Sequence, residues 1–253
     1  MDELTHPLTV SRQLANAREY WLGYGAQTQR HGSYLLYRSG VADAQLNGVM
    51  SFDGGRVADR LQEIEQTLTG VPWLWWVGPD SDDTTADDLT RHGYREVGSM
   101  PVMAVLLDSV RSAPPSAGLE IRHVTDAAAL DEWVRCYTTA FGTTAAREEI
   151  ARLESVRTGT PDRFIRYSGY LDGQVVGTAA LFATEDVAGV YVVSTLEEFR
   201  GRGIGTALTA AALRAGRHMG LTTGTLQASS MGVPVYERMG FREVARYRLL
   251  MKN

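Results

Sequence analysis

The segment Phe199-Arg200-Gly201-Arg202-Gly203-Ile204-Gly205-Thr206 decides how this chain is interpreted. A run typical of a β-strand, Val187–Thr195, precedes it, and a pattern of helical period follows it from Thr206 to Met219. A glycine-rich loop that leads into a helix exposes backbone N–H groups at the positive end of the helix dipole. The segment therefore predicts an anion site suited to the phosphate or pyrophosphate of a nucleotide-like cofactor.

Three phosphate-binding patterns compete for this loop. The P-loop pattern G-x-x-x-x-G-K-[ST] requires a lysine, but the one lysine of the chain is Lys252. The dinucleotide pattern G-x-G-x-x-G requires a third glycine where this chain has Thr206 or Leu208, depending on the starting glycine. The third pattern, [QR]-x-x-G-x-[GA], is met by Arg200, Gly203 and Gly205.

The sequence after the loop supports the third pattern. The predicted helix has His218 in its last turn and Gly220 at its C-cap, and a strand is expected at Thr223–Ala228. The segment from Ser229 to Phe241 then carries a tyrosine, Tyr236, and ends in Gly-Phe. Loop, helix, strand and Tyr-x-x-x-Gly-Phe resemble, in order and spacing, the two cofactor motifs of the GCN5-related N-acetyltransferases (GNATs), which bind acetyl-CoA.

The resemblance covers residues 119–253 and implies an α/β (α+β) fold with a mixed, mostly antiparallel sheet flanked by helices. Residues 111–118 form a Pro/Ser/Gly-rich stretch that predicts a linker. Residues 1–110 repeat the plan weakly, and Gly93-Tyr94 stands where Gly240-Phe241 stands in the second half. We interpret residues 1–110 as a degenerate GNAT-like domain without a cofactor loop, because Asp53 would repel a pyrophosphate; an unrelated α/β domain is the alternative.

Several finer expectations follow from the pattern of residues. A helix is expected at Val10–Gln27, and a hairpin turn at Asp172-Gly173. Trp73, Trp75 and Trp76 are expected in the core rather than on a stacking surface.

The resemblance also implies the cofactor residues. Backbone N–H groups of the glycine loop would anchor the pyrophosphate, and the end of the preceding strand would pair with the pantetheine arm, with an N–H near Val193 facing the thioester oxygen. Tyr236 matches the family tyrosine that stands near the sulfur and protonates the departing thiolate. Ser229 occupies the place of a common asparagine, and Gly232 that of a common alanine. The cofactor-binding set is Val193, Ser194, Thr195, Arg200, Gly201, Arg202, Gly203, Ile204, Gly205, Thr206, Ser229 and Tyr236, with Tyr236 catalytic.

The general base is not given by the sequence. Some family members place a glutamate early on the strand before the loop, where this chain reads Val187-Ala188-Gly189-Val190-Tyr191. Glu185 and Asp186 are the nearest carboxylates, but as turn residues they have an ordinary structural interpretation. A water chain or Tyr191 is the remaining alternative.

Composition narrows the class of protein. A net charge of −5 gives no general attraction to nucleic acid, and no apolar run reaches the roughly 18 residues of a membrane span. One cysteine, Cys136, excludes an internal disulfide and a cysteine-rich metal site, and its apolar setting indicates a core residue. We expect a cytoplasmic enzyme without a metal, monomeric or homodimeric.

The leading functional hypothesis is an N-acetyltransferase that moves an acetyl group from acetyl-CoA to a primary amine of a small molecule by direct attack in a ternary complex. The alternatives are a non-catalytic acyl-CoA-binding or regulatory module, motivated by the missing strand carboxylate, and an acyltransferase that uses another acyl-CoA. The acceptor amine is not identified by any motif.

Overall fold

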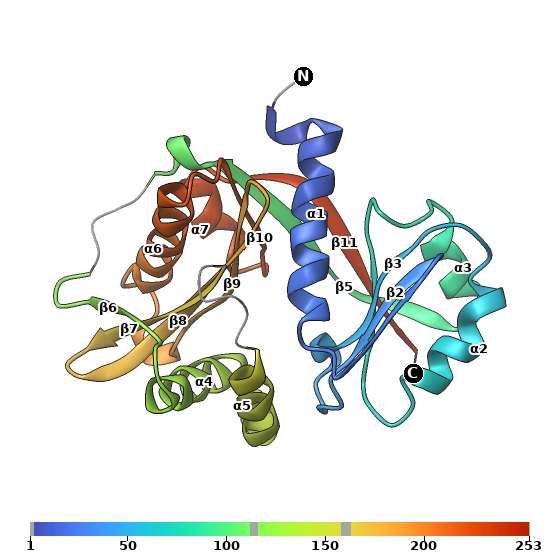
Figure 1. The fold of residues 1–253 in the computed structure, drawn as a ribbon, viewed down its shortest axis with the longest axis horizontal. Helices are drawn as coiled ribbons and strands as arrows, with labels where there is room; N and C mark the ends of the chain where they lie inside the picture. Colours follow the sequence, from blue (N-terminus) through green and yellow to red (C-terminus); the bar gives the residue numbers. More distant parts are fainter. Residues whose placement is uncertain (1–2, 112–115, 158–162, 253) are drawn as a thin grey trace. The chain divides into compact units, whose positions relative to one another are not determined.

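A computed structural model describes residues 3–111, 116–157 and 163–252 of the chain (Figure 1). The chain divides into two compact units. Unit 1 consists of Met1–Asn16 and Met103–Arg242, and unit 2 consists of Ala17–Val102 and Glu243–Asn253. Three elements pass from one unit to the other along the chain: α1 (Pro7–Leu22), β5 (Tyr94–Leu106) and β11 (Arg242–Lys252).

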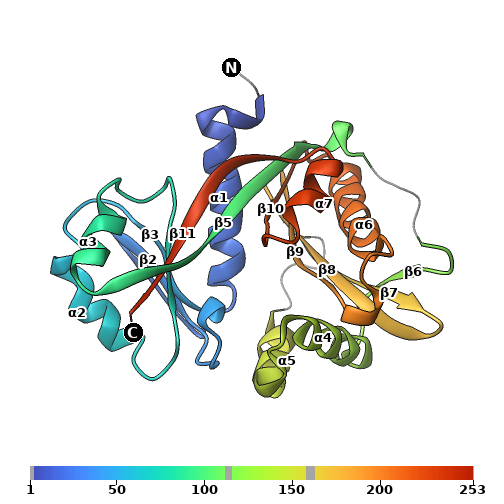
Figure 2. The same ribbon diagram turned by 180° about the vertical axis from the view of Figure 1, so that it is seen from behind.

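Unit 1 contains a sheet in the order β5-β10-β9-β8-β7-β6, in which β9 and β10 pair in parallel and the pairs β6–β7, β7–β8 and β8–β9 are antiparallel. Helices α6 and α7 lie on one side of β7 to β9, and α4 and α5 lie on the other (Figure 2). The sequence order β-α-α-β-β-β-α-β-α-β that the resemblance implied is the order found from β6 to β11. The elements are β6 (Glu120–His123), α4 (Ala127–Phe141), α5 (Arg147–Val156), β7 (Phe164–Leu171), β8 (Gln174–Thr184), β9 (Val187–Thr195), α6 (Ile204–His218), β10 (Thr223–Gln227) and α7 (Val233–Arg238).

Local sequence signals explain several of these boundaries. Helix α4 begins after Asp126, whose carboxylate caps the helix by accepting a hydrogen bond from the N–H of Ala129 at 2.8 Å. Asp172 and Gly173 have φ of 50° and 79°, which is the backbone that a two-residue type I′ hairpin requires. The predicted hairpin between β7 and β8 is therefore confirmed.

Helix α6 packs closely on its sheet because the sheet and the helix both carry glycine at the contact. A Cβ on Gly177 of β8 would lie 2.8 Å from Cγ2 of Ile204, and one on Gly216 of α6 would lie 2.6 Å from Cβ of Ala188. Buried aliphatic residues such as Val176, Leu208 and Leu226 fill the same interface. This close approach fixes the start of α6 relative to β8 and β9, and so fixes the glycine loop.

Unit 2 has the sheet order β1-β2-β3-β4-β11-β5. Its core includes Trp75 and Trp76, each 1% exposed, which confirms their expected burial. Trp73 precedes β4 and is only partly buried, packed against that core, so the expectation was wrong for this residue. Gly93 and Gly240 both have positive φ, and each precedes a buried aromatic residue, so the two halves share this turn. The elements are β1 (Gln27–His31), β2 (Tyr34–Arg38), β3 (Asn47–Phe52), α2 (Ala58–Thr67), β4 (Leu74–Val77) and α3 (Thr85–Arg91), with β11 and most of β5.

The helix expected at Val10–Gln27 was placed too far along the chain. Helix α1 ends at Leu22, and residues 27–31 form strand β1, paired antiparallel with β2. Strand β1 reads Gln-Thr-Gln-Arg-His and is mostly exposed, so it lacks the apolar alternation that reveals a strand. It forms because the neighbouring edge of β2 offers a hydrogen-bonding partner.

Each unit takes a strand from a distant part of the chain. In unit 1 the neighbour of β10 is the end of β5, where the hydroxyl of Thr225 donates to the carbonyl of Met103 at 3.2 Å. In unit 2 the neighbour of β4 is β11, with Leu249 opposite Trp76. The units are thus not the residue sets 1–110 and 119–253. The division of the sequence into two related domains stays a prediction, and residues 112–115 of its linker lie outside the described residues.

Candidate functional site

The glycine loop has the geometry of an open helix N-terminus. Gly201 and Gly203 have φ of 77° and 75°, a region that side-chain-bearing residues seldom occupy. Gly203 is the N-cap of α6 and brings no side chain to the cap. The first N–H groups of a helix have no acceptor within it, and the first helical bond here runs from Ala207 N–H to Gly203 O. The N–H groups of residues 204–206 are thereby left for an anion.

The two arginines of the loop are exposed and contact nearby backbone. The guanidinium of Arg200 lies within 3.5 Å of the carbonyls of Thr195 and Ala140. The guanidinium of Arg202 lies over the ring of Phe199, 5.1 Å from its centroid, and near the carbonyl of Glu198. Both side chains add positive charge around the loop, and neither is held by an ion pair that the structure records.

Strands β9 and β10 separate after Gly189 and Thr225, before the glycine loop is reached. Their parallel pairing runs from Val187 with Thr223 to Gly189 with Thr225 and stops there. Strand β9 continues to Thr195 and stays paired with β8 alone. The backbone edge of β9 beyond Gly189 therefore faces a gap between two parallel strands, at their carboxyl ends, which is where ligands bind in sheets of this kind.

A β-bulge interrupts β9 inside this gap. The pairing with β8 shifts between Ala180–Tyr191 and Thr178–Ser194, so one extra residue lies on β9. Val192 at the bulge has φ of 51°, an unusual conformation for a β-branched residue. A bulge re-aims the backbone groups that follow it, and here the next group is the N–H of Val193.

The residues after the bulge divide between the two faces of the sheet. A Cβ on Gly205 would lie 3.7 Å from Cγ1 of Val193 and from Oγ1 of Thr195, so these two side chains face the glycine loop. The hydroxyl of Ser194 instead lies 2.7 Å from that of Thr178 and is buried within the sheet. The structure therefore brings Val193, Thr195 and Gly205 together, while the side chain of Ser194 bonds to Thr178 of the neighbouring strand β8.

Tyr236 is held on α7 with its ring fixed on two sides. Its ring makes an edge contact with Phe241 at 5.7 Å between centroids, and a Cβ on Gly232 would lie 2.8 Å from Cε2 of Tyr236. Burial raises the pKa of the Tyr236 phenol to about 12, and the nearby Thr209 side chain opposes that rise. The phenol is therefore kept protonated at neutral pH, as a proton donor must be.

Ser229 has a structural use at the start of α7. Its hydroxyl accepts from the N–H of Gly232 at 3.2 Å, and its carbonyl accepts from the N–H groups of Gly232 and Val233. The hydroxyl thus holds the turn before α7, on which the position of Tyr236 depends. The predicted contact of Ser229 with a cofactor stays a prediction.

The carboxylates proposed for the general base lie at the wrong end of β9. Arg12 of α1 pairs with Asp186 at 2.9 Å and with Glu185 at 3.4 Å. Asp186 precedes Val193 by seven residues, about 20 Å along an extended strand. These two carboxylates therefore hold the turn between β8 and β9. Tyr191 is also engaged, because its hydroxyl donates to Oδ1 of Asn16 at 2.6 Å.

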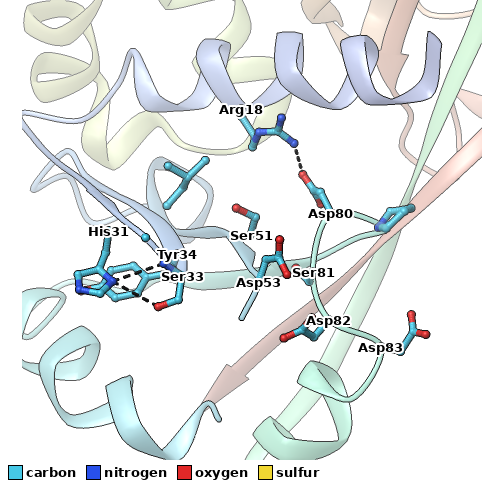
Figure 3. A pocket seen from close by; sticks show the side chains of 13 residues that line it. Arg18, His31, Ser33, Tyr34, Ser51, Asp53, Asp80, Ser81, Asp82 and Asp83 are labelled. Carbon is cyan, nitrogen blue, oxygen red and sulfur yellow. Dashed lines mark hydrogen bonds and ion pairs between the residues drawn. The ribbon is translucent and has the colours of Figure 1, made fainter. Parts of the chain in front are cut away.

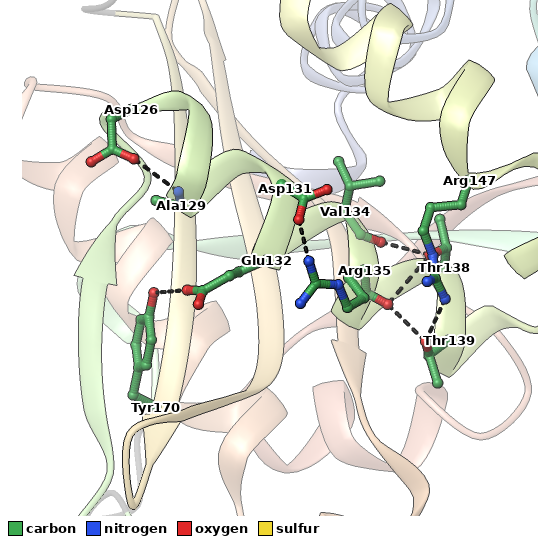
Figure 4. Close-up of polar contacts among 10 residues, drawn as sticks. All are labelled: Asp126, Ala129, Asp131, Glu132, Val134, Arg135, Thr138, Thr139, Arg147 and Tyr170. Carbon is green, nitrogen blue, oxygen red and sulfur yellow. Dashed lines mark hydrogen bonds and ion pairs between the residues drawn. The ribbon is translucent and has the colours of Figure 1, made fainter.

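Helix α4, on the opposite side of the sheet from α6, presents polar groups that bond to one another (Figure 4). Glu132 accepts from the hydroxyl of Tyr170 at 2.9 Å, and Asp131 pairs with Arg135. Arg147 at the start of α5 reaches the hydroxyls of Thr138 and Thr139, each at 3.3 Å. Further along, the fully buried Glu154 pairs with Arg157 and Arg166. The Tyr170–Glu132 bond ties α4 to β7, the Arg147 bonds tie α5 to α4, and the Arg166–Glu154 pair ties α5 to β7.

Cys136 of α4 is buried and lies near Ser194. Burial raises the pKa of its thiol to about 12, and a hydrogen bond with Ser194 opposes that rise. A thiol that stays protonated is a poor nucleophile, which agrees with the expected core role. Among the described residues no three His, Cys, Asp or Glu side chains form a group able to hold a metal ion. No helix within the described residues is long and apolar enough to cross a membrane.

Unit 2 has a cavity of about 650 Å³ where its own two parallel strands, β3 and β4, end (Figure 3). Four carboxylates line it, with Arg18 paired to Asp80 across it. Desolvation raises the pKa of Asp80, and Arg18 opposes that rise. Such a lining repels a pyrophosphate, which supports the prediction that this half holds no cofactor. The four carboxylates are Asp53, Asp80, Asp82 and Asp83.

Three parts of the site could not be expected from the sequence. The bulge falls on Val192, a residue type that favours regular strand, so nothing local signals it. Thr178 and Asn16, which bond to the residues around the bulge, lie far away in sequence and belong to no motif. The close contact of Gly232 with Tyr236 had one signal, namely the absence of the alanine common at that position in the family.

Comparison with known proteins agrees with this geometry. Residues 127–241 match the family model described as the acetyltransferase (GNAT) family. The chain is 27% identical over 221 residues to a mycothiol acetyltransferase of Pseudarthrobacter chlorophenolicus, in an alignment that covers 81% of this chain and 67% of that relative.

Two solved structures are similar along most of the chain. One is a GCN5-related N-acetyltransferase from Kribbella flavida, with a TM-score of 0.70 at 19% identity and 94% coverage of both chains. The other is a tandem GNAT protein from the clavulanic acid biosynthesis pathway, with a TM-score of 0.59 at 14% identity, covering 95% of this chain and 94% of that chain. At these identities the likeness concerns the fold, which is the expected α/β fold with helices flanking a mostly antiparallel sheet.

Proposed function

We propose that this protein, an acyltransferase whose residues 127–241 match the GNAT acetyltransferase family model, transfers an acetyl group from acetyl-CoA to a primary amine of a small molecule. The observation that carries the proposal is the placement of the bulge beside the open start of α6, with Val193 and Thr195 facing Gly205. A pyrophosphate at the loop and a thioester at the bulge would then belong to one extended ligand.

The residues present fit acetyl-CoA. The loop N–H groups and the positive end of α6 suit the pyrophosphate. The edge of β9 beyond Gly189 lacks its β10 partner, so its backbone groups suit the amides of the pantetheine arm. An N–H of Val193 directed at the thioester oxygen would stabilise the charge that develops there, an effect worth about 3 kcal/mol.

Direct transfer in a ternary complex needs these groups, a proton donor for the sulfur and an acceptor for the amine proton. The amine nitrogen attacks the thioester carbonyl carbon, the C–S bond breaks, and the sulfur receives the phenolic proton of Tyr236. The amine loses its proton to solvent, and the Tyr236 phenolate regains a proton from solvent. The relative named mycothiol acetyltransferase supports acetyl as the group transferred and a small molecule as the acceptor.

The test is to incubate the purified full chain with acetyl-CoA and a panel of small-molecule amines, and to follow the release of free thiol. We expect acetyl-CoA-dependent thiol release with at least one amine and a matching acetylated product by mass spectrometry. Binding of acetyl-CoA without turnover of any amine would favour a non-catalytic acyl-CoA-binding module. Turnover with a longer acyl-CoA in preference to acetyl-CoA would change the transferred group.

A further inference from the structure

The bulge of β9 holds a conformation that its own sequence disfavours. A positive φ at a valine is maintained only where the surrounding structure fixes it. Two sets of buried hydrogen bonds do so here, one on each side of Val192 along the strand.

The first set comes from β8. The hydroxyl of Thr178 donates to the carbonyl of Val192 at 2.7 Å and lies 2.7 Å from the hydroxyl of Ser194. Thr178 is fully buried, so these bonds are shielded from water. This set holds Val192 and the residue that lies two positions after it.

The second set comes from the first helix of the chain. Asn16 of α1, also fully buried, accepts through Oδ1 from the hydroxyl of Tyr191 at 2.6 Å. Its Nδ2 donates to the carbonyl of Phe182 at 3.0 Å and to the hydroxyl of Thr184 at 2.8 Å. Asn16 thereby ties the residue just before the bulge to the neighbouring strand β8.

Gly189 makes room for this arrangement. A Cβ at Gly189 would lie 2.0 Å from Oδ1 of Asn16 and 2.6 Å from Cε2 of Tyr191. The amide of Asn16 therefore sits in a notch that only glycine leaves open. Glycine is otherwise unfavourable in a strand, so its presence here serves the close approach of Asn16.

We propose that Asn16 is a positioning residue for acetyl transfer, which fixes the β9 bulge through Tyr191 so that the N–H of Val193 stays directed at the thioester oxygen. The inference rests on the proposed function. Asn16 touches no reacting atom and acts through the strand. Asn16 thus supports β9 from outside residues 127–241, the part of the chain that matches the family model.

Docking of α1 alone is the competing explanation, and the chain offers a control for it. Arg12 lies one turn before Asn16 on α1 and also bonds to unit 1, through Asp186 and Glu185. Those partners precede β9, far from the bulge. Arg12→Ala therefore weakens the attachment of the helix without touching Tyr191, whereas Asn16→Ala and Tyr191→Phe remove the bond beside the bulge.

The experiment compares these three variants with the wild-type full chain. It measures kcat, the dissociation constants of acetyl-CoA and of CoA, the melting temperature, and hydrogen exchange of the peptide containing residues 190–195. For Asn16→Ala and Tyr191→Phe we expect kcat to fall on the order of tenfold to a hundredfold. The affinity for acetyl-CoA should fall several-fold relative to CoA, and exchange should rise in residues 190–195. Arg12→Ala should keep kcat, the affinity for acetyl-CoA relative to CoA, and the exchange of residues 190–195 within about twofold of wild type.

Gly189→Ala gives a second test, because its methyl group would press on both the Asn16 amide and the Tyr191 ring, and so disturb the bond between them without removing either partner. The double variant Asn16→Ala/Gly189→Ala should lose less activity than the product of the two single effects, because both changes act on the same bond. Folded Asn16→Ala or Tyr191→Phe variants with unchanged exchange and an unchanged ratio of the two affinities would overturn the proposal. If the wild type turns over no amine, the proposed function fails, while the exchange and affinity measurements still decide the role of Asn16.

Discussion

Gly232 lies directly against the ring of Tyr236: a Cβ at Gly232 would stand 2.8 Å from Cε2 of the tyrosine. The backbone of Gly232 has φ of −78°, so alanine is compatible with its conformation and only the added methyl group is too close. Gly232→Ala should therefore move the ring and lower kcat severalfold while the dissociation constant of CoA changes little. Gly98→Ala, where a Cβ meets nothing within 4 Å, is the control. Equal activity of both variants would show that the exact place of the ring is unimportant.

Removing the Tyr236 hydroxyl separates proton donation from packing. Tyr236→Phe keeps the edge contact with Phe241 but leaves the departing thiolate without its acid. Loss of a general acid lowers rates by about 10²- to 10⁴-fold, and we expect kcat to fall within this range with the affinity for acetyl-CoA retained. Steady-state kinetics and calorimetry check the two parts. An unchanged kcat would indicate that water, rather than Tyr236, protonates the departing thiolate.

The pH dependence follows from the raised pKa of the same phenol. Burial raises the pKa of Tyr236 to about 12, so the active, protonated form persists throughout the usual assay range and kcat should show no basic limb from this group below about pH 10. The same raised pKa lowers the free energy of unfolding at high pH. Above about pH 10, the pKa of an unfolded tyrosine, the unfolded chain binds fewer protons than the native one. The free energy of unfolding therefore falls as the pH rises from about 10 to about 12. A basic limb that disappears in Tyr236→Phe would contradict this assignment.

The glycine loop can be tested against a glycine of equal backbone strain. Gly203 and Gly220 flank α6, both have positive φ, and a Cβ at either meets nothing within 4 Å. Alanine at either position should destabilise the fold by about 1 kcal/mol. Only Gly203→Ala should also weaken acetyl-CoA binding, by about tenfold or more, because it reshapes the anion cradle. Melting temperatures and calorimetry distinguish the two effects, and equal binding by both variants would contradict a pyrophosphate at this loop.

The acidic cavity of unit 2 predicts the stoichiometry of cofactor binding. Four carboxylates at the end of β3 and β4 oppose the charge of a pyrophosphate, so calorimetry should give one acetyl-CoA per chain. Gly203→Ala should weaken that single site and leave no site of wild-type affinity. A site of unchanged affinity in this variant would place a second cofactor in the N-terminal half.

Sequence reasoning reached the parts of the site that depend on local conformation. Gly203 could be interpreted because a loop before a helix needs positive φ and free N–H groups, and Tyr236 because a short motif places it. The bulge at Val192 and its partners Thr178 and Asn16 were beyond its reach, since their hydrogen bonds join residues brought together only by the completed sheet. Strand β1 could not be predicted for a related reason, because its polar residues adopt a strand conformation only through pairing with β2.

The placement of β5 and β11 bears on how the chain is made in the cell. Unit 2 cannot complete its sheet until β11 has emerged from the ribosome, long after β4, because β11 is the strand that pairs with β4. Unit 1 in turn needs the end of β5, so a gene fragment that begins at the predicted linker would encode an acetyltransferase unit with a missing strand and an exposed edge on β10. Domains commonly fold in order from the N-terminus during synthesis, whereas unit 2 of this chain is expected to complete its sheet only after β11 has been made.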